Sequence, residues 1–218
     1  MMIQNYSHLF TRKKINKIGF KEILDIEESK FELNSEIIYN KHFKEQNIID
    51  EIRFITFEDC IFENCNIDTK FTKCEFVNCK FISSDLSNSV FIECSIHFNT
   101  ITNSKLLGVS IIESLIKNSI LENNMADMLN LSNTKFNNVE IKNNSLNKSR
   151  FYLIKLTKVI LDNNKMNDIE FLETSLNNID LTSNEITNIK INLNDIKGCI
   201  IDNTQIYDLI NLLEIKIK

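Results

Sequence analysis

The chain has 218 residues and a formal net charge of −5, with no proline, three glycines and six cysteines. This length fits one domain, and the mild negative charge argues against a general polyanion-binding protein. No run of 18 apolar residues occurs, and the N-terminus lacks the apolar core of a secretory signal. We therefore expect a soluble cytoplasmic protein with no membrane partner.

Residues 1–47 show no regular pattern. Basic residues gather between Arg12 and Lys21, acidic ones between Asp25 and Glu32, and the apolar residues only loosely suggest an amphipathic helix. We interpret 1–47 as an irregular, partly helical N-terminal cap or extension. A nucleic-acid or partner-binding arm is the alternative interpretation of the basic cluster.

A period of five residues organises the rest of the chain. Every fifth residue from Phe71 to Ile201 is apolar, 27 positions in all. In a chain of this composition, independent draws would give that result with a probability of about 10⁻¹⁰. Five fits neither the period of an α-helix nor that of a plain strand, but it fits a short extended piece followed by a corner.

The other positions of the repeat agree with this division. If the apolar residue is the centre, the residue two before it faces the same way, and none of these residues is charged. Two residues after the centre, asparagine fills 12 of 27 places. Asparagine tolerates the left-handed backbone region, so we expect the corners there.

These repeats resemble a known family. Cys-Glu-Phe-Val-Asn at 74–78 and Ser-Asp-Leu-Ser-Asn at 84–88 are similar to the pentapeptide-repeat consensus. The resemblance implies an all-β solenoid, a right-handed quadrilateral β-helix with four repeats in each coil. It covers residues 48–202, which corresponds to seven to eight coils.

Four repeats in a coil would stack residues twenty apart on four sides. We number the sides in chain order by their centres: side one has Phe71 and Phe91, side two Phe76 and Ile96, side three Phe81 and Ile101, and side four Leu86 and Leu106. Side four carries inward amides that can hydrogen-bond from coil to coil. We predict a structural asparagine ladder of Asn124, Asn144, Asn164 and Asn184.

The cysteines do not indicate a metal or disulfide site. All six occupy the small inward position, and neighbours five residues apart fall on different sides of the coil. No phosphate loop or nucleophile–base pair is recognisable, and a filled solenoid lacks the concave pocket of most enzymes. We therefore expect reduced structural thiols, no catalytic, cofactor-binding or metal-binding residues, no cofactor, and no enzymatic activity.

Charge is sorted by side. Side two is net basic, whereas side three presents acidic residues that could imitate a phosphate backbone for a DNA-binding protein without contacting nucleic acid itself. Chance asymmetry of surface charge is the equally weighted alternative. The candidate topoisomerase-binding acidic face consists of Glu122, Glu140, Asp162, Asp180 and Asp202. Leu115, Ile120 and Met125 form an outward apolar patch, to be covered by the N-terminal extension or by a partner.

Residues 203–218 leave the five-residue period. A capping candidate at Asn203 or Thr204 precedes apolar residues at helical spacing, which predicts a C-terminal capping helix. The apolar residues exceed what one cap needs, so we expect a two-fold pairing of caps into a homodimer. The candidate dimer and cap residues are Ile206, Tyr207, Leu209, Ile210, Leu212, Leu213, Ile215 and Ile217.

The C-terminus also resembles the quinolone-resistance (Qnr) branch of the pentapeptide-repeat family. The similar residues are 195–203, Gln205 and 209–217, together with Phe43, Phe57, Cys60 and Phe62 near the start. The resemblance implies a C-terminally joined dimer that binds DNA gyrase or topoisomerase IV, mimics DNA and protects these bacterial enzymes from fluoroquinolones. The unbroken period leaves no room for projecting loops, and Glu214 stands where glycine is usual. The alternative is a repeat scaffold with another partner and no effect on gyrase.

Overall fold

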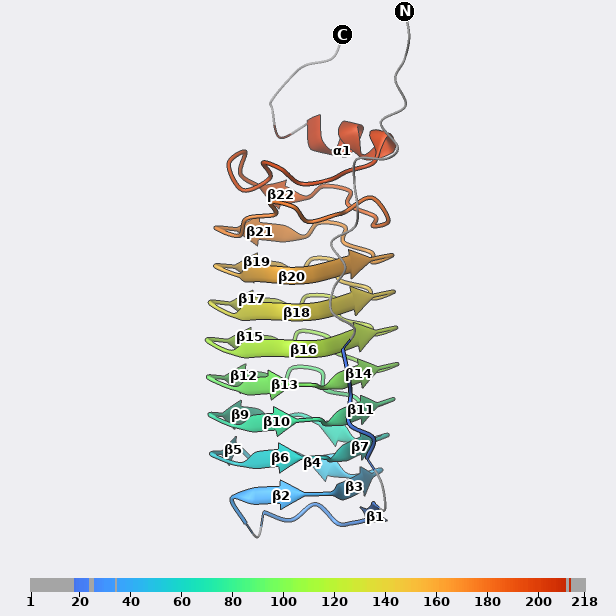
Figure 1. The fold of residues 1–218 in the computed structure, drawn as a ribbon, viewed down its shortest axis with the longest axis vertical. Helices are drawn as coiled ribbons and strands as arrows, with labels where there is room; N and C mark the ends of the chain where they lie inside the picture. Colours follow the sequence, from blue (N-terminus) through green and yellow to red (C-terminus); the bar gives the residue numbers. More distant parts are fainter. Residues whose placement is uncertain (1–17, 24–25, 34, 211, 213–218) are drawn as a thin grey trace, which may run out of the picture.

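The computed structural model describes residues 18–23, 26–33, 35–210 and 212. The chain winds into a rod of stacked coils in which every paired strand is parallel to its neighbours (Figure 1). Side one stacks eight strands in one sheet, so the rod has about eight coils. This is the parallel, four-sided β-solenoid that the resemblance to pentapeptide repeats implies.

Side one has a constant register. Phe71 pairs with Phe91, which pairs with Ile111, so each coil takes twenty residues as predicted. Its strands are β5 (Ile52–Arg53), β9 (Lys70–Thr72), β12 (Val90–Ile92), β15 (Ser110–Ile112), β17 (Asn130–Ser132), β19 (Arg150–Tyr152), β21 (Glu170–Leu172) and β22 (Lys190–Ile191).

Sides two and three belong to one sheet because three long strands run across the corner between them. The long strands are β16 (Leu115–Glu122), β18 (Lys135–Lys142) and β20 (Lys155–Asp162). Side two also has β2 (Ile37–Tyr39), β6 (Thr56–Glu58), β10 (Glu75–Val77) and β13 (Ser95–His97), and side three has β1 (Glu27–Glu28), β3 (Lys41–Lys44), β7 (Ile61–Glu63), β11 (Lys80–Ile82) and β14 (Thr100–Thr102).

Side four has the least strand structure. It contains the pair β4 (Asn47–Ile48) and β8 (Asn66–Ile67), and it continues as single bridges from Asp85 to Glu185. Its corners are turns in which the backbone N–H of Ser89 donates to the carbonyl of Leu86 at 3.0 Å. Asn88, the third residue of that turn, has φ +64°, which is the type II geometry.

The corners fall where the asparagines predict them. Between Lys73 and Asn188, every non-glycine residue with positive φ lies two positions after a centre. Asparagine accepts this left-handed conformation readily, whereas Phe98, Met128 and Leu153 adopt it with bulkier side chains. Gly108 and Gly198 occupy two of the same corner positions.

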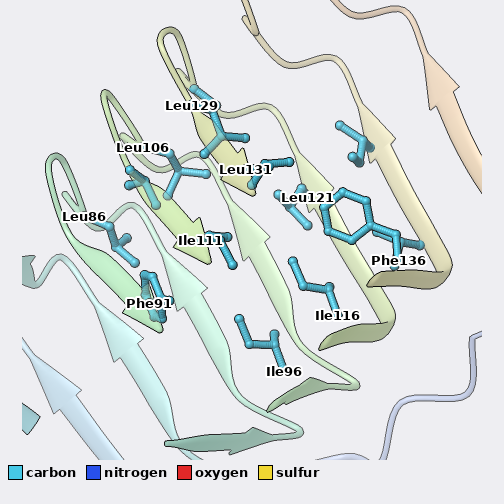
Figure 2. Packing of buried hydrophobic residues seen from close by; sticks show 14 of the residues in the cluster. Leu86, Phe91, Ile96, Leu106, Ile111, Ile116, Leu121, Leu129, Leu131 and Phe136 are labelled. Carbon is cyan, nitrogen blue, oxygen red and sulfur yellow. The ribbon is translucent and has the colours of Figure 1, made fainter. Parts of the chain in front are cut away.

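The centres fill the rod as one continuous hydrophobic core. Figure 2 shows leucine, isoleucine and phenylalanine side chains from successive coils, such as Leu86, Phe91 and Ile111, pointing into the same interior. Most centres from Phe71 to Ile191 are under a tenth exposed. Burying apolar surface at every fifth residue is what stabilises strands of only two or three residues.

Regular stacking begins before residue 48, where the repeat was expected to start. Ile38 pairs with Phe57, and Phe43 pairs with Phe62, both nineteen residues along the chain. The offset is nineteen because one repeat in the first coil is a residue short, with four residues instead of five between the buried centres Ile48 and Ile52. The same short step recurs one coil later, from Ile67 to Phe71. Over residues 18–23 and 26–33, irregular backbone and strand β1 replace the helix that the apolar spacing loosely suggested.

The C-terminal cap begins one residue earlier than expected. Asp202, rather than Asn203 or Thr204, is the N-cap of a 3₁₀ turn (Asn203–Gln205) that leads into α1 (Ile206–Ile210). Asp202 accepts a hydrogen bond from the Thr204 N–H at 2.9 Å, and Gln205 Oε1 accepts one from the Asp202 N–H at 2.8 Å. This reciprocal capping box fixes where the solenoid ends.

Candidate protein-binding surface

The inward polar side chains on side four form one hydrogen-bonded column along the rod. On side four, each inward oxygen accepts a hydrogen bond from the backbone N–H of the coil before it. Asn124, Asn144 and Asn164 donate their N–H groups to the Oδ1 atoms of Asn144, Asn164 and Asn184 at 2.8–2.9 Å. The amide Nδ2 atoms donate to carbonyls one coil back, such as Asn164 to Ile141 at 2.8 Å.

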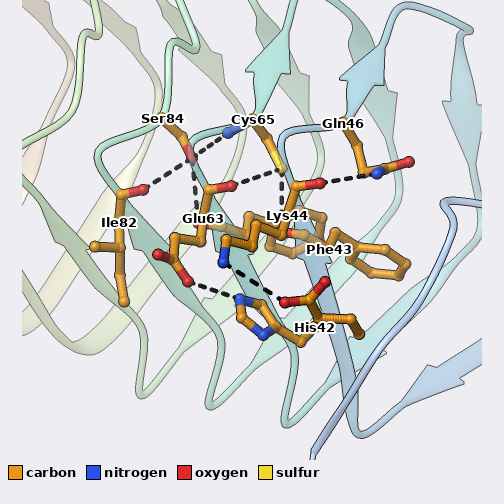
Figure 3. Close-up of polar contacts among 10 residues, drawn as sticks. His42, Phe43, Lys44, Gln46, Glu63, Cys65, Ile82 and Ser84 are labelled. Carbon is orange, nitrogen blue, oxygen red and sulfur yellow. Dashed lines mark hydrogen bonds and ion pairs between the residues drawn. The ribbon is translucent and has the colours of Figure 1, made fainter.

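This column is longer than four asparagines. Figure 3 shows its start, where the Cys65 N–H donates to Ser84 Oγ and the Cys65 thiol donates to the Phe43 carbonyl. At the other end, Gln205 Nε2 donates to the carbonyls of Leu181 and Asn184 at 2.9 and 2.7 Å. Because the buried polar groups of the column are satisfied by the fold itself, they form no ligand site.

The cysteines are placed as structural thiols. Cys60, Cys65, Cys74, Cys79 and Cys94 are buried, Cys199 is half-buried, and all six are free. Burial raises the pKa of the Cys65 thiol, which keeps it neutral. Across the described residues, no three His, Cys, Asp or Glu side chains are grouped to hold a metal ion.

The five carboxylates of the acidic face lie on side three, but they do not form one continuous column. Glu140 pairs in register with Ile120 and Ile160, so apolar residues separate it from the acidic residues of its column. In the second column, Lys142 stands between Glu122 and Asp162 and forms an ion pair with Glu140. Glu122, Glu140 and Lys142 therefore give the middle of side three a formal net charge of only −1.

The negative charge concentrates at the C-terminal end of side three. Asp180 Oδ1 accepts hydrogen bonds from the Thr182 N–H and hydroxyl at 3.0 and 2.7 Å. Asp162 Oδ1 accepts one from the Ser183 hydroxyl at 2.8 Å. Hydrogen bonds from Thr204, first of all from its backbone N–H, lower the pKa of Asp202. These hydrogen bonds orient all three carboxylates.

The charge density sets a limit on imitation of DNA. Glu122 and Asp202 are four coils apart, which is roughly 19 Å at the strand spacing of about 4.8 Å. Five carboxylates over this length give about one charge per 4 Å, against one per ~1.7 Å of duplex DNA. The face can attract a basic groove, but its charge is sparser than that of the polymer.

The other sequence-predicted surface residues are distributed over several sides. Lys135 and Lys155 pair in register on side two, and Leu115 precedes them in the same column. Leu115 and Ile120 are half-buried, whereas Met125 on side four is 53% exposed. The structure thus leaves Met125 accessible and does not gather these residues into one wide apolar patch.

Some apolar residues of the cap pack against the core, and others are exposed. Leu209 and Leu212 pack against the core, and Ile210 is half-buried. Ile206 and Tyr207 are 46% and 73% exposed. Leu213, Ile215 and Ile217 lie outside the described residues. No helix in the described part of the chain is long and apolar enough to cross a membrane.

Sequence reasoning missed one polar cluster. Lys21 of the N-terminal segment forms an ion pair with the buried Asp59, and Asn78 donates hydrogen bonds to both residues. Asp59 and Asn78 were recognisable only as corner residues. No periodic signal could have predicted their contact with Lys21, because residues 18–23 lie outside the repeat.

Comparisons with known proteins find matches among solved structures. No protein-family model matches the sequence, and no curated protein matches it. Among solved structures, a trypsin-treated form of QnrB1, a plasmid-mediated fluoroquinolone resistance protein, is 16% identical with a TM-score of 0.45; the similarity covers 81% of this chain and 98% of that one. HetL, a pentapeptide-repeat protein involved in heterocyst differentiation regulation in the cyanobacterium Nostoc, is 8% identical with a TM-score of 0.41 and covers 75% and 84%.

Proposed function

We propose that this pentapeptide-repeat protein is a non-catalytic scaffold that binds a DNA-binding protein, of the type II topoisomerase class, through the C-terminal half of side three. The supporting observation is the set of three oriented carboxylates, Asp162, Asp180 and Asp202, in which one oxygen of each accepts a hydrogen bond from a neighbouring hydroxyl. A basic DNA-binding groove is the complementary surface, because opposite potentials accelerate and orient association.

The proposed partner agrees with the resemblance of the C-terminus to the quinolone-resistance branch. In this proposal, binding of DNA gyrase or topoisomerase IV competes with DNA and protects the enzyme from fluoroquinolones in the bacterial cytoplasm. The filled interior supports a binding role over catalysis, because its polar column is satisfied by the fold.

The exposed Ile206 and Tyr207 support a homodimer joined through the caps. A two-fold pairing there would bury both residues and bring the acidic ends of two rods together. In light scattering, we expect the wild-type protein to have the mass of a dimer and Tyr207→Glu that of a monomer. A monomeric wild-type protein would refute the pairing.

Gyrase supercoiling with and without ciprofloxacin tests the partner. We expect the purified protein at micromolar concentration to inhibit supercoiling or to restore it in the presence of the drug. The double variant Asp162→Lys/Asp180→Lys reverses two of the three oriented charges and should lose this effect. The matched control, Glu113→Lys/Glu173→Lys, changes the same charge at two exposed corners of side one and should keep it.

A second candidate is favoured by the low charge density of side three. If the wild-type protein neither inhibits gyrase nor restores its activity, the topoisomerase assignment is wrong, and the rod is a scaffold for a different partner. Retained activity in the Asp162→Lys/Asp180→Lys variant would instead place the contact on another side.

A further inference from the structure

The N-terminal segment 18–23, which we call the strap, lies across stacked corners of the rod. The corners between sides two and three carry Asp59, Asn78, Phe98, Asn118 and Asn138 in successive coils. In Figure 1 the strap runs along the rod, roughly at right angles to the strands. Lys21 of the strap contacts the corner residues Asp59 and Asn78, and Ile18 lines a hollow together with the corner residues Phe98, Asn118 and Asn138. We call this run of corners under the strap the corner groove.

The end of the strap near the first coils is tightly held. Lys21 Nζ lies 2.5 Å from Asp59 Oδ2, and the Asp59 side chain is 5% exposed. Asn78 Nδ2 donates to the Lys21 carbonyl at 3.1 Å and to Asp59 Oδ1 at 2.7 Å. Burial by itself would raise the pKa of Asp59, but the hydrogen bonds from Lys21 and Asn78 lower it. Asp59 thus favours a cationic side chain in the bound segment, and Asn78 binds the backbone carbonyl of the same residue.

The other end of the strap fits its groove poorly. Ile18 is 9% exposed, yet a hollow of about 240 Å³ remains beside it. This volume is several times the ~30 Å³ that one water molecule occupies in the liquid. The hollow is lined by Ile18, Gly19, Phe98, Lys117, Asn118, Asn137, Asn138 and Lys158.

An unsatisfied acceptor lies in the same wall. Asn138 is 7% exposed, and its Nδ2 donates to Asn118 Oδ1 at 2.8 Å. Its Oδ1 is buried and has no hydrogen-bond donor in the described part of the chain. An unpaired buried acceptor destabilises the fold, and the backbone N–H of an extended chain is a suitable donor.

The charges at this end also favour another occupant. Lys117 and Lys158 border the hollow, and the strap residues that line it, Ile18 and Gly19, are uncharged. An acidic residue of another occupant at this end would be attracted by both lysines.

We propose that the corner groove is a docking site for an extended segment of a partner protein, and that the strap occupies it in the absence of the partner. The preferred segment has a lysine that pairs with Asp59. Three residues before this lysine it has an apolar side chain larger than isoleucine, and the residue before that apolar one is acidic. Such a segment displaces the strap because it fills the hollow and keeps the ion pair. This site is separate from the acidic face of side three and does not depend on it.

A labelled peptide tests the proposal with the full-length chain. The probe is fluorescein-labelled residues 17–23 with glutamate in place of Lys17 and phenylalanine in place of Ile18. In Lys21→Glu the strap is repelled from Asp59, so fluorescence anisotropy should show peptide binding at least tenfold tighter than in the wild type. The wild-type strap competes at the millimolar effective concentration of a tethered segment. Lys135→Glu, with the same charge change at an exposed site on side two, should behave as the wild type.

The chemistry of the site is tested separately. Adding Asp59→Asn to Lys21→Glu should remove binding, and so should replacing the peptide lysine by methionine. Lys21→Ala serves as a second strap-released variant if Lys21→Glu does not fold by circular dichroism. Equal binding to wild type and Lys21→Glu, binding that survives Asp59→Asn, or no binding to either folded released variant would overturn the proposal.

Discussion

Two coils of the rod reach the same cross-section with different side chains. The coil that begins at side one with Phe71 has Phe76, Phe81 and Leu86 as its other centres, and its inward small positions are Thr69, Cys74, Cys79 and Ser84. The coil of Phe171 has Leu176, Leu181 and Ile186 as centres, with Ile169, Thr174, Ile179 and Asn184 inward. Large centres pair with small inward residues, and smaller centres with larger ones.

In these two coils, side-chain volume is thus exchanged between the centres and the inward positions. Parallel strands must stack at one spacing, so a coil that is wider or narrower than its neighbours would lose their hydrogen bonds. In the N-terminal coils the core is aromatic, and Phe76 lies against Phe57, Phe71, Phe81 and Phe91 with ring centroids 5.1–5.9 Å apart. In the C-terminal coils, amides and branched side chains take over this space.

Removal of an aromatic centre should give the largest effect. Phe76 is 1% exposed and contacts four rings, so Phe76→Ala should lower the free energy of unfolding by about 3–5 kcal/mol. Leu181→Ala, at a centre in the Leu/Ile-rich coils, removes fewer atoms and should cost less. Urea unfolding followed by circular dichroism measures both. An equal or larger loss in Leu181→Ala would contradict the expectation that the aromatic contacts stabilise the N-terminal coils more strongly.

A reciprocal exchange within side four tests whether side-chain volume, in addition to hydrogen bonding, specifies the residue at each inward position. Ser84 and Asn164 occupy the same column, and both side chains accept a backbone N–H and donate to a carbonyl one coil back. Ser84→Asn should overpack an aromatic coil, and Asn164→Ser should leave a cavity in a coil with smaller centres. Each should destabilise by about 1–3 kcal/mol in urea unfolding. If both exchanges are neutral, hydrogen bonding alone specifies the column.

Exchange of a thiol for a hydroxyl should have the smallest effect. Cys74 is fully buried, and its thiol donates to the carbonyls of Ile52 and Thr72 at 3.5 and 3.6 Å. Ser84, two repeats later, makes the equivalent contacts with the carbonyls of Phe62 and Ile82, so Cys74→Ser should cost about 1 kcal/mol or less. Cys74→Leu, which preserves hydrophobicity but adds volume, is the control and should cost more. A loss above that of Phe76→Ala in Cys74→Ser would show that the thiol has a specific role.

Some of the candidate site was accessible from the sequence. The five-residue period placed the acidic residues on side three and the inward amides on side four, because each position of a repeat has one direction. Because residues twenty apart stack, the period also placed Ile120 and Ile160 beside Glu140, and Lys142 between Glu122 and Asp162. Only the structure shows that Lys142 forms its ion pair with Glu140, because that contact depends on the direction of two long side chains.

The sequence by itself determined the repeat: the apolar centres, the uncharged inward positions and the asparagine corners are local consequences of burial and of backbone sterics. Only the tertiary structure decided where the solenoid starts and ends and what the N-terminal segment does. Ile38, Asp202 and the ion pair of Lys21 with Asp59 act across the ends of the repeat, where a residue's partner is set by docking and not by period. A periodic pattern predicts which way each side chain points, but it does not predict which residue outside the repeat will contact it.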